Sequence, residues 1–171
     1  MNYDTAFQPT ITTMKKHSIL FVCLGNICRS PAAEGIMRHI VSEPGATGSW
    51  IIDSAGTSRY HIGDLPDHRM RLHARRRGIE LTHRCRQVTE SDFDDFDLII
   101  GMDSANISNL RAIAPTPEAE SKIHAMSEYF SPSARHDHVP DPYYEGAEGF
   151  ELVLDILDDA CRNLYHSLTQ S

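Results

Sequence analysis

The eight-residue segment CLGNICRS, from Cys23 to Ser30, carries the residue types needed for phosphate chemistry. In a loop that leads from a strand into a helix, backbone N–H groups point toward one centre and can bind an anion. Arg29 adds a planar guanidinium that suits two phosphate oxygens at once. These dipoles and Arg29 favour the thiolate of Cys23, which is the nucleophilic form of a cysteine. The segment therefore predicts attack of Cys23 on phosphorus, with a cysteinyl-phosphate intermediate and no metal ion.

The Cys-x5-Arg spacing by itself occurs by chance in many sequences, so its structural context decides its meaning. A buried strand is predicted over 18–23, followed by a glycine turn and an amphipathic helix over 31–42. Ser30 is expected to cap this helix and Pro31 to occupy its first position. This context favours an anion-binding loop over the alternative, a buried cysteine beside a surface arginine.

A second candidate group is a carboxylate far along the chain, Asp141, in the segment DPYY. Cleavage of a phosphate ester with a poor leaving group needs a general acid. Pro142 restricts the backbone of Asp141 to an extended shape. A carboxyl held near a phosphate and tyrosine rings can stay protonated long enough to serve as that acid. On its own an Asp-Pro pair is only a turn signal, so the role of Asp141 is a hypothesis.

Short apolar runs alternate with longer stretches of helical periodicity along the chain. This order predicts an α/β protein whose parallel sheet is covered on both faces. Such sheets bind ligands at the carboxyl ends of their strands, where Cys23 would lie. One domain is expected at 17–171, after an extension at 1–16 that lacks a clear period and is predicted to be flexible. Strands are predicted at 18–23, 50–54, 96–101 and 122–126, and helices at 31–42, 66–77, 103–112 and 150–168.

The charge and cysteine content exclude several classes of protein. With a net charge of −8, the chain is not expected to bind nucleic acid or an anionic membrane surface through its overall field. No apolar run approaches the roughly 18 residues that a membrane-spanning helix needs. Four cysteines without a Cys-x-x-Cys pair argue against a disulfide scaffold and against a zinc site. A cytoplasmic protein with reactive thiols, no metal and no cofactor is therefore expected.

Together, the CLGNICRS and DPYY segments resemble the low-molecular-weight protein tyrosine phosphatases. The resemblance extends from about Lys16 to Ser167 and includes WIIDSAG at 50–56, GIELTHRCR at 78–86 and FDLIIGMD at 96–103. It implies a three-layer α/β/α fold with a four-stranded parallel sheet, and hydrolysis of phosphotyrosine and small aryl phosphates. The implied partners are phosphotyrosine proteins, with a tyrosine kinase as one candidate. A monomer is expected, and a weak dimer is left open.

The resemblance also implies roles for individual residues. Cys23 corresponds to the nucleophile, Arg29 to the phosphate-binding residue, and Asp141 to the general acid that later acts as base. Ser30 would stabilise the Cys23 sulfur as a leaving group. Three further groups are the phosphate-binding loop at Leu24, Gly25, Asn26, Ile27 and Cys28, its supports Asn26, Ser54 and His83, and the pocket walls Leu24, Tyr60, Tyr143 and Tyr144.

Two further cysteines need an interpretation. Cys28 lies in the same loop as Cys23, and oxidation could join the two in a disulfide. The alternative for Cys28 is a packing residue under the helix start. Cys85 stands where the family leads us to expect a small residue such as alanine, and a buried packing role is favoured over a redox role.

Other interpretations remain open from the sequence. An arsenate reductase shares the fold and the loop but usually carries two more cysteines close together, whereas this chain has only Cys85 and the distant Cys161. A non-catalytic phosphate-binding module would not need a cysteine, an arginine and a distant aspartate together. The run at 69–77 holds five arginines and could dock an acidic partner, although a solvated helix face is favoured. His136 and His138 are more typical of a polar surface loop than of a metal site.

Overall fold

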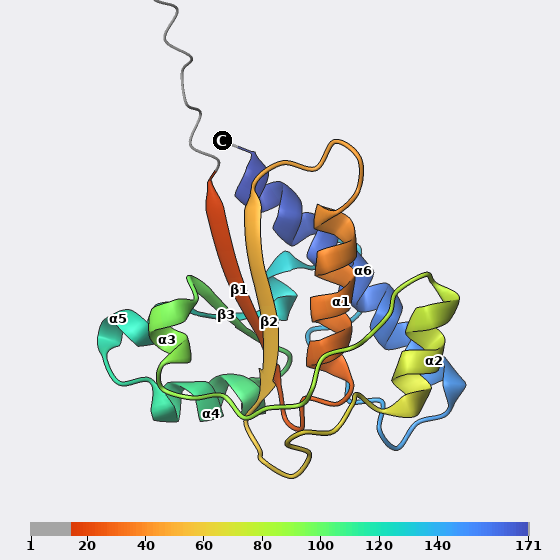
Figure 1. Ribbon diagram of the computed structural model, residues 1–171, viewed down its shortest axis with the longest axis horizontal. Helices are drawn as coiled ribbons and strands as arrows, with labels where there is room; N and C mark the ends of the chain where they lie inside the picture. Colours follow the sequence, from red (N-terminus) through yellow and green to blue (C-terminus); the bar gives the residue numbers. More distant parts are fainter. Residues whose placement is uncertain (1–14, 171) are drawn as a thin grey trace, which may run out of the picture.

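Four parallel strands form one sheet in the computed structural model, which describes residues 15–170 (Figure 1). The strand order is β2-β1-β3-β4, and all three pairs of neighbours are parallel. This arrangement confirms the predicted α/β fold with a four-stranded parallel sheet. The strands are β1 (Lys16–Cys23), β2 (Ser49–Gly56), β3 (Leu98–Gly101) and β4 (Ile123–Ala125).

Helices cover both faces of this sheet, as a three-layer fold requires. In Figure 1, α1, α2 and α6 lie on one side of the sheet, and α3, α4 and α5 lie on the other. The structure confirms the four longer helices that the sequence predicts, whereas α3, α5 and η1 are too short to show a helical period. No helix among residues 15–170 is long and apolar enough to cross a membrane. The helices are α1 (Arg29–Val41), α2 (His68–Arg76), α3 (Asp92–Asp95), α4 (Ser104–Ile113), α5 (Pro117–Glu120), the 3-10 helix η1 (Met126–Tyr129) and α6 (Ala147–Thr169).

The start of β1 corrects one predicted boundary. The predicted extension at 1–16 includes Lys16, but Lys16 pairs with Ser49 of β2. Lys16 is therefore part of the sheet. Residues 1–14 of the predicted extension lie outside the described residues.

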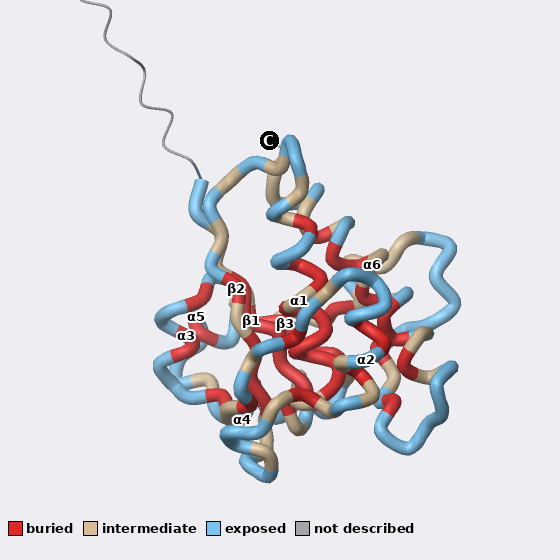
Figure 2. Tube along the Cα trace, turned by 45° about the vertical axis from the view of Figure 1, so that its right-hand side comes forward, coloured by how far each residue is buried: buried red, intermediate tan, exposed pale blue. Residues whose placement is uncertain are grey.

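The central strand β1 is buried from Ile19 to Cys23 (Figure 2). Its side chains alternate between two cores. Ile19 and Phe21 pack in the core that α1 and α6 complete. Leu20 and Val22 pack in the core on the other face, which α3, α4 and α5 complete. Burial of each large apolar side chain contributes about 1.5–3 kcal/mol, so the strand is firmly anchored. Cys23, its last residue, is thereby held at the carboxyl edge of the sheet.

Candidate active site

The loop between β1 and α1 surrounds the thiol of Cys23. Only residues 24–28 connect the strand to the helix. Within them Asn26 has a φ of 56°, the only positive φ at a non-glycine residue in the described part of the chain. This left-handed conformation tightens the turn. The Cys23 residue is 3% exposed, and its sulfur lies 3.0 Å from Ser30 Oγ and 3.4 Å from the Ser30 backbone nitrogen, which donates to it.

Ser30 does not cap α1, so that prediction is wrong. The helix begins two residues earlier than predicted, at Arg29, and Cys28 occupies the cap position without a side-chain hydrogen bond. The Ser30 hydroxyl faces the Cys23 sulfur instead. Because the first turn of α1 also contains no acidic residue, the positive end of its dipole remains available to an anion in front of Cys23.

Arg29 is buried and held by two fixed acceptors. Its Nη1 donates to Asp103 Oδ2 at 2.6 Å and to the Val139 carbonyl at 3.1 Å. Burial raises the pKa of Asp103, but hydrogen bonds from Arg29 and from the backbone of α4 outweigh it and hold that pKa below its usual value. From the sequence Asp103 is expected only at the start of the helix predicted at 103–112, and it does cap α4 by accepting the Asn106 N–H at 2.9 Å. No sequence signal marks its second role, because its partner lies 74 residues away.

A buried polar network behind the loop fixes the orientation of Asn26. The Asn26 amide donates to Ser30 Oγ at 2.7 Å and to Ser54 Oγ at 3.0 Å, and Ser54 in turn donates to Glu34 Oε1 at 2.8 Å. The side-chain oxygen of Asn26, Oδ1, faces His83 Nε2 at 2.9 Å. The structure therefore brings the predicted supports Asn26, Ser54 and His83 together, and it adds Glu34, which the sequence analysis missed.

His83 and two carboxylates form a cluster that resembles a metal site in its composition. Its Nδ1 lies 3.1 Å from Glu34 Oε1 and 3.3 Å from Asp53 Oδ1. Among the described residues this is the one group of three such side chains whose donor atoms lie within 4.8 Å of one another. The other ring nitrogen, Nε2, contacts the Asn26 side-chain oxygen, so the same ring links both carboxylates to the phosphate-binding loop. We therefore assign the cluster to support of the loop.

Two close packing contacts hold the back of the loop. A Cβ on Gly56 would lie 2.8 Å from the Leu24 carbonyl oxygen and 3.0 Å from the Asn26 nitrogen, so only glycine fits there. The Cys85 thiol donates to the Asn26 carbonyl at 2.8 Å. Burial raises the pKa of Cys85 to about 11, which keeps it a neutral thiol. The structure thus favours the packing interpretation of Cys85.

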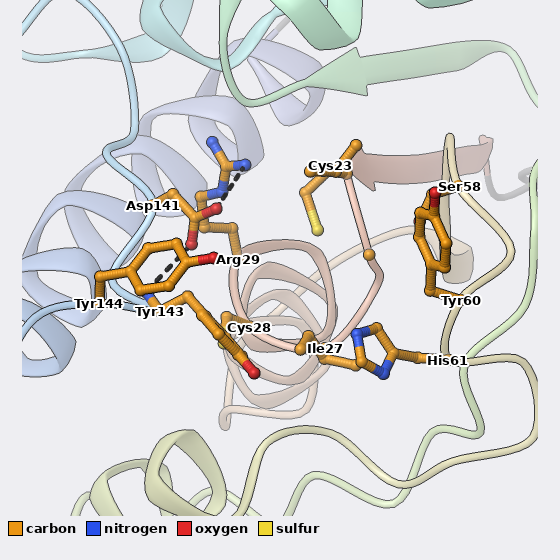
Figure 3. Close-up of a pocket in the computed structure, with 12 residues that line it drawn as sticks. Cys23, Ile27, Cys28, Arg29, Ser58, Tyr60, His61, Asp141, Tyr143 and Tyr144 are labelled. Atoms are coloured by element: carbon orange, nitrogen blue, oxygen red, sulfur yellow. Dashed lines mark hydrogen bonds and ion pairs between the residues drawn. The ribbon is translucent and has the colours of Figure 1, made fainter.

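The pocket in front of Cys23 has a volume of about 250 Å³ (Figure 3). Tyr60 and His61 stand on one side of its mouth, and Tyr143 and Tyr144 stand on the other. Ser58 and His61 also line this pocket, although the sequence analysis did not single them out. They follow β2 in a polar loop whose composition carries no motif. The lining residues are Cys23, Leu24, Gly25, Ile27, Cys28, Arg29, Ser58, Tyr60, His61, Asp141, Tyr143 and Tyr144.

Asp141 lies at the mouth of this pocket and faces Arg29. Its Oδ2 is 3.7 Å from Arg29 Nη2, beyond hydrogen-bond distance. Its Oδ1 accepts the Tyr143 N–H at 3.1 Å, which orients the carboxylate within its own loop. The side chain is 44% exposed, so both solvent and a ligand in the pocket can reach it.

Cys28 lines the same pocket and is a free, buried cysteine. Burial raises its pKa well above the usual value, and the negative charges of Asp67, Cys23 and Asp141 raise it further. Cys28 therefore carries a neutral thiol beside the more polar environment of Cys23.

The remaining sequence motifs lie away from this pocket or are paired within the chain. In the arginine-rich run, Arg75 pairs with Glu80 at 2.9 Å and Arg77 with Asp155 at 2.9 Å, which favours the solvated helix face over a docking patch. His138 contacts Asp137 at 2.7 Å in an exposed loop.

Comparison with known proteins agrees with this geometry. Residues 18–171 match the family model described as low molecular weight phosphotyrosine protein phosphatase. The chain is 44% identical to the low molecular weight protein-tyrosine-phosphatase YfkJ of Bacillus subtilis over 152 residues, which cover 88% of this chain and 95% of that protein. It is 40% identical to the human low molecular weight phosphotyrosine protein phosphatase over 146 residues, which cover 85% and 91% of the two chains.

A solved structure with the same arrangement is that of the protein tyrosine phosphatase from Entamoeba histolytica, with Hepes in its active site. It is 44% identical, has a TM-score of 0.84, and the match covers 89% of this chain and 96% of that one. These relatives decide against an arsenate reductase and against a non-catalytic binding module. The chain therefore belongs to the low molecular weight phosphotyrosine protein phosphatase family and is a protein-tyrosine phosphatase.

Proposed function

We propose that phosphotyrosine hydrolysis proceeds in two steps, with Cys23, Arg29 and Asp141 as the acting groups. In the first step the Cys23 thiolate attacks phosphorus while Asp141 gives its proton to the departing tyrosine oxygen, so cysteinyl phosphate and free tyrosine form. In the second step the Asp141 carboxylate takes a proton from an attacking water molecule, and the Cys23 sulfur departs as thiolate. Inorganic phosphate leaves, and Asp141 is protonated again for the next cycle.

The observation that carries this proposal is the position of the Cys23 sulfur, at the centre of the loop and opposite a fixed guanidinium. The Ser30 backbone donates to this sulfur at 3.4 Å, and the Ser30 hydroxyl lies 3.0 Å away. These donors stabilise negative charge on sulfur both when it attacks and when it departs. The two fixed acceptors of Arg29 both bind Nη1, which leaves the hydrogens on Nε and Nη2 for two phosphoryl oxygens.

The placement of Asp141 supports its role as acid and base. Its Oδ2 lies 3.7 Å from Arg29 Nη2, so a phosphate held by Arg29 would bring the departing tyrosine oxygen close to the carboxyl group. In the first step a proton on this carboxyl group would pass to that oxygen, and in the second step the carboxylate would take a proton from water.

The side chains around the mouth support an aromatic substrate. Leu24, Tyr60, Tyr143 and Tyr144 are all exposed, although each has a large apolar or aromatic surface. Such a patch around a concave site is typical of a ligand-binding surface. A phosphotyrosine ring that enters between Tyr60 and Tyr143 would cover this surface and place its phosphate on the loop below.

The mechanism is tested by hydrolysis of p-nitrophenyl phosphate and of a phosphotyrosine peptide in the presence of EDTA. The wild type should be fully active, whereas Cys23→Ser should show no turnover because a hydroxyl lacks thiolate character. Arg29→Lys should lose about 10²–10³-fold in kcat, since a point charge cannot replace the planar fork. Cys161→Ala, which removes a buried thiol of α6, is the matched control and should retain activity. Full activity of Cys23→Ser, or loss of wild-type activity in EDTA, would rule the mechanism out.

Cys28 is proposed as the thiol that captures an oxidised Cys23. Peroxide converts the Cys23 thiolate to a sulfenic acid, with hydroxide released. The neutral Cys28 thiol then displaces water from that sulfur and forms the Cys23–Cys28 disulfide. The shared pocket and the free state of both thiols support this step. The disulfide would protect the nucleophile from further, irreversible oxidation.

The proposed substrates in the cell are phosphotyrosine proteins, with a tyrosine kinase as a candidate among them. A nucleophilic thiolate works only while it is reduced, which supports a reducing compartment such as the cytoplasm. Substrate trapping with Cys23→Ser, and with Asp141→Ala in parallel, followed by mass spectrometry, would identify these proteins. The chain is proposed to act as a monomer, which light scattering on a sizing column measures directly.

A further inference from the structure

A second hollow lies directly beside the phosphotyrosine pocket. It has a volume of about 580 Å³ and is lined by Ser58, Arg59, Tyr60 and Gln87. We refer to these four residues as the Arg59 groove. Ser58 and Tyr60 also line the phosphotyrosine pocket, so the Tyr60 side chain stands between the two hollows. Figure 3 shows this side of the rim, across the pocket from Tyr143 and Tyr144.

Arg59 gives the groove a positive charge that no described residue neutralises. It is exposed and takes part in none of the ion pairs found between residues 15 and 170. Arg69, near the opposite rim, is by contrast bound to Asp67 at 2.9 Å. The chain as a whole carries a net charge of −8, so an acidic peptide approaches it against the overall field. A local positive charge such as that of Arg59 would offset this repulsion.

The polar groups beside Arg59 suit a carboxylate-bearing chain. The Gln87 side chain donates its amide to the Thr57 carbonyl at 3.2 Å, which fixes it as one wall of the groove. Ser58 lines both hollows, and its hydroxyl is buried without a hydrogen-bond partner among the described residues. A buried hydroxyl without a partner costs free energy, and rotation of the Ser58 side chain toward an acceptor on a bound peptide would relieve that cost.

We propose that the Arg59 groove binds an aspartate or glutamate that lies next to phosphotyrosine in the substrate sequence. Arg59 is then a specificity-determining residue, and the inference rests on the proposed placement of the phosphotyrosine ring against Tyr60. An extended peptide advances about 3.3–3.6 Å per residue. A residue one or two positions from phosphotyrosine therefore crosses the width of Tyr60 and brings its carboxylate to Arg59.

The expected preference is modest, because Arg59 is exposed to solvent. An ion pair between exposed groups changes a binding constant by about two- to fivefold. We therefore expect acidic peptides to exceed neutral ones in kcat/KM by this factor. The preference should fall as salt is added, since exposed charges are screened within about 10 Å at 0.1 M ionic strength.

The test compares three phosphotyrosine peptides that differ only at the two residues on one side of phosphotyrosine: glutamate, glutamine or lysine. A second series varies the other side. The enzymes are wild type, Arg59→Gln, Arg59→Glu and Arg76→Gln. Arg76 is exposed near the end of α2 and lines neither hollow, so its substitution changes the net charge equally and serves as the matched control.

In one of the two series the wild type should prefer glutamate, Arg59→Gln should abolish the preference, and Arg59→Glu should reverse it in favour of lysine. Arg76→Gln should keep the wild-type ratio. A wild-type ratio near one in both series, or an equal loss in the Arg76 variant, overturns the proposal. Hydrolysis of the glutamine peptides by the wild type reports separately on the proposed mechanism, which can fail or hold whatever the ratio shows.

Discussion

Replacing Asp103 with asparagine should weaken the fold and catalysis together, because Asp103 is the ionic partner of a buried guanidinium. Its Oδ2 accepts from Arg29 Nη1 at 2.6 Å, and Arg29 is 3% exposed. Asparagine is as good a helix cap as aspartate, so its oxygen can still accept the Asn106 N–H at the start of α4. Its amide nitrogen would then face Arg29, so two hydrogen-bond donors would oppose each other. The substitution therefore removes the ion pair and little else.

The size of the effect follows from the burial of the pair. A hydrogen bond to a charged group contributes about 1.5–3 kcal/mol, and breaking a fully buried ion pair costs about 3–5 kcal/mol. The Asp103 side chain is 25% exposed, so solvent screens part of the interaction and the lower range applies. In a domain of this size 1 kcal/mol corresponds to about 2–4 °C, so Tm should fall by roughly 3–12 °C. Asp103→Ala also loses the helix cap, which costs about a further 0.5–2 kcal/mol.

The loss should depend on pH in a defined direction. Burial raises the pKa of Asp103, but the hydrogen bond from Arg29 and those from the backbone of α4 lower it more, so the folded-state pKa lies below the usual value. A group with a lowered pKa stabilises the fold above its unfolded pKa and loses that contribution as pH falls through its folded pKa. The difference between wild type and Asp103→Asn should therefore be full at pH 7 and shrink below about pH 3.9.

Urea unfolding at several pH values measures this difference in stability. The catalytic loss is measured as kcat/KM for p-nitrophenyl phosphate. We expect kcat/KM to fall at least about tenfold, because Arg29 is no longer fixed. Asp158→Asn is the matched control, because Asp158 pairs with Arg162 at 3.2 Å on the surface of α6. That variant should lose less than about 0.5 kcal/mol and keep its activity. If Asp103→Asn loses no more stability than Asp158→Asn, the assigned role of Asp103 is refuted.

Three further variants test the other parts of the site. Asp141→Ala should slow esters with poor leaving groups far more than esters with good ones, and should flatten the basic limb of the pH–rate profile; an equal loss for all esters would make Asp141 structural. Tyr60→Ala should raise KM for aryl phosphates and largely spare kcat, so a collapse of kcat at constant KM would contradict its place in the pocket wall. Cys28→Ser should remain active but recover poorly with dithiothreitol after peroxide treatment, and recovery equal to wild type, or a disulfide from Cys23 to Cys85 or Cys161, would contradict the proposed pairing.

The sequence predicts the strand, the loop and the helix around Cys23 because each depends on residues close together in the chain. β1 is recognisable from its continuous apolar run, since both of its faces are buried. Most of α6 is likewise predicted by its apolar stripe, which faces one core, although the helix begins three residues before the predicted start. The loop is placed by the same strand, because it begins at the carboxyl end of β1.

The groups that hold the site in place were not accessible from local sequence patterns. In the sequence, Asp103 is a residue at the start of a predicted helix and Glu34 is a polar residue within another. Only the folded chain brings Asp103 to Arg29 and Glu34 to Ser54. The start of α1 was misplaced because Ser30 fits a cap by its type, whereas its hydroxyl is held by Asn26 and the Cys23 sulfur. In each case a contact between distant segments overrides the local preference.

The two acceptors that fix Arg29 lie 74 and 110 residues further along the chain. We expect contacts between such distant segments to form late in folding, because closing a long loop costs entropy before the contact can repay it. The nucleophile and the arginine are made early in the chain, but the arginine gains its fixed orientation only when β3 and the segment before α6 have docked. During refolding, the return of phosphatase activity should therefore lag behind the formation of α1 and coincide with the last cooperative step, so that a partly folded chain carries the loop without hydrolysing phosphoproteins.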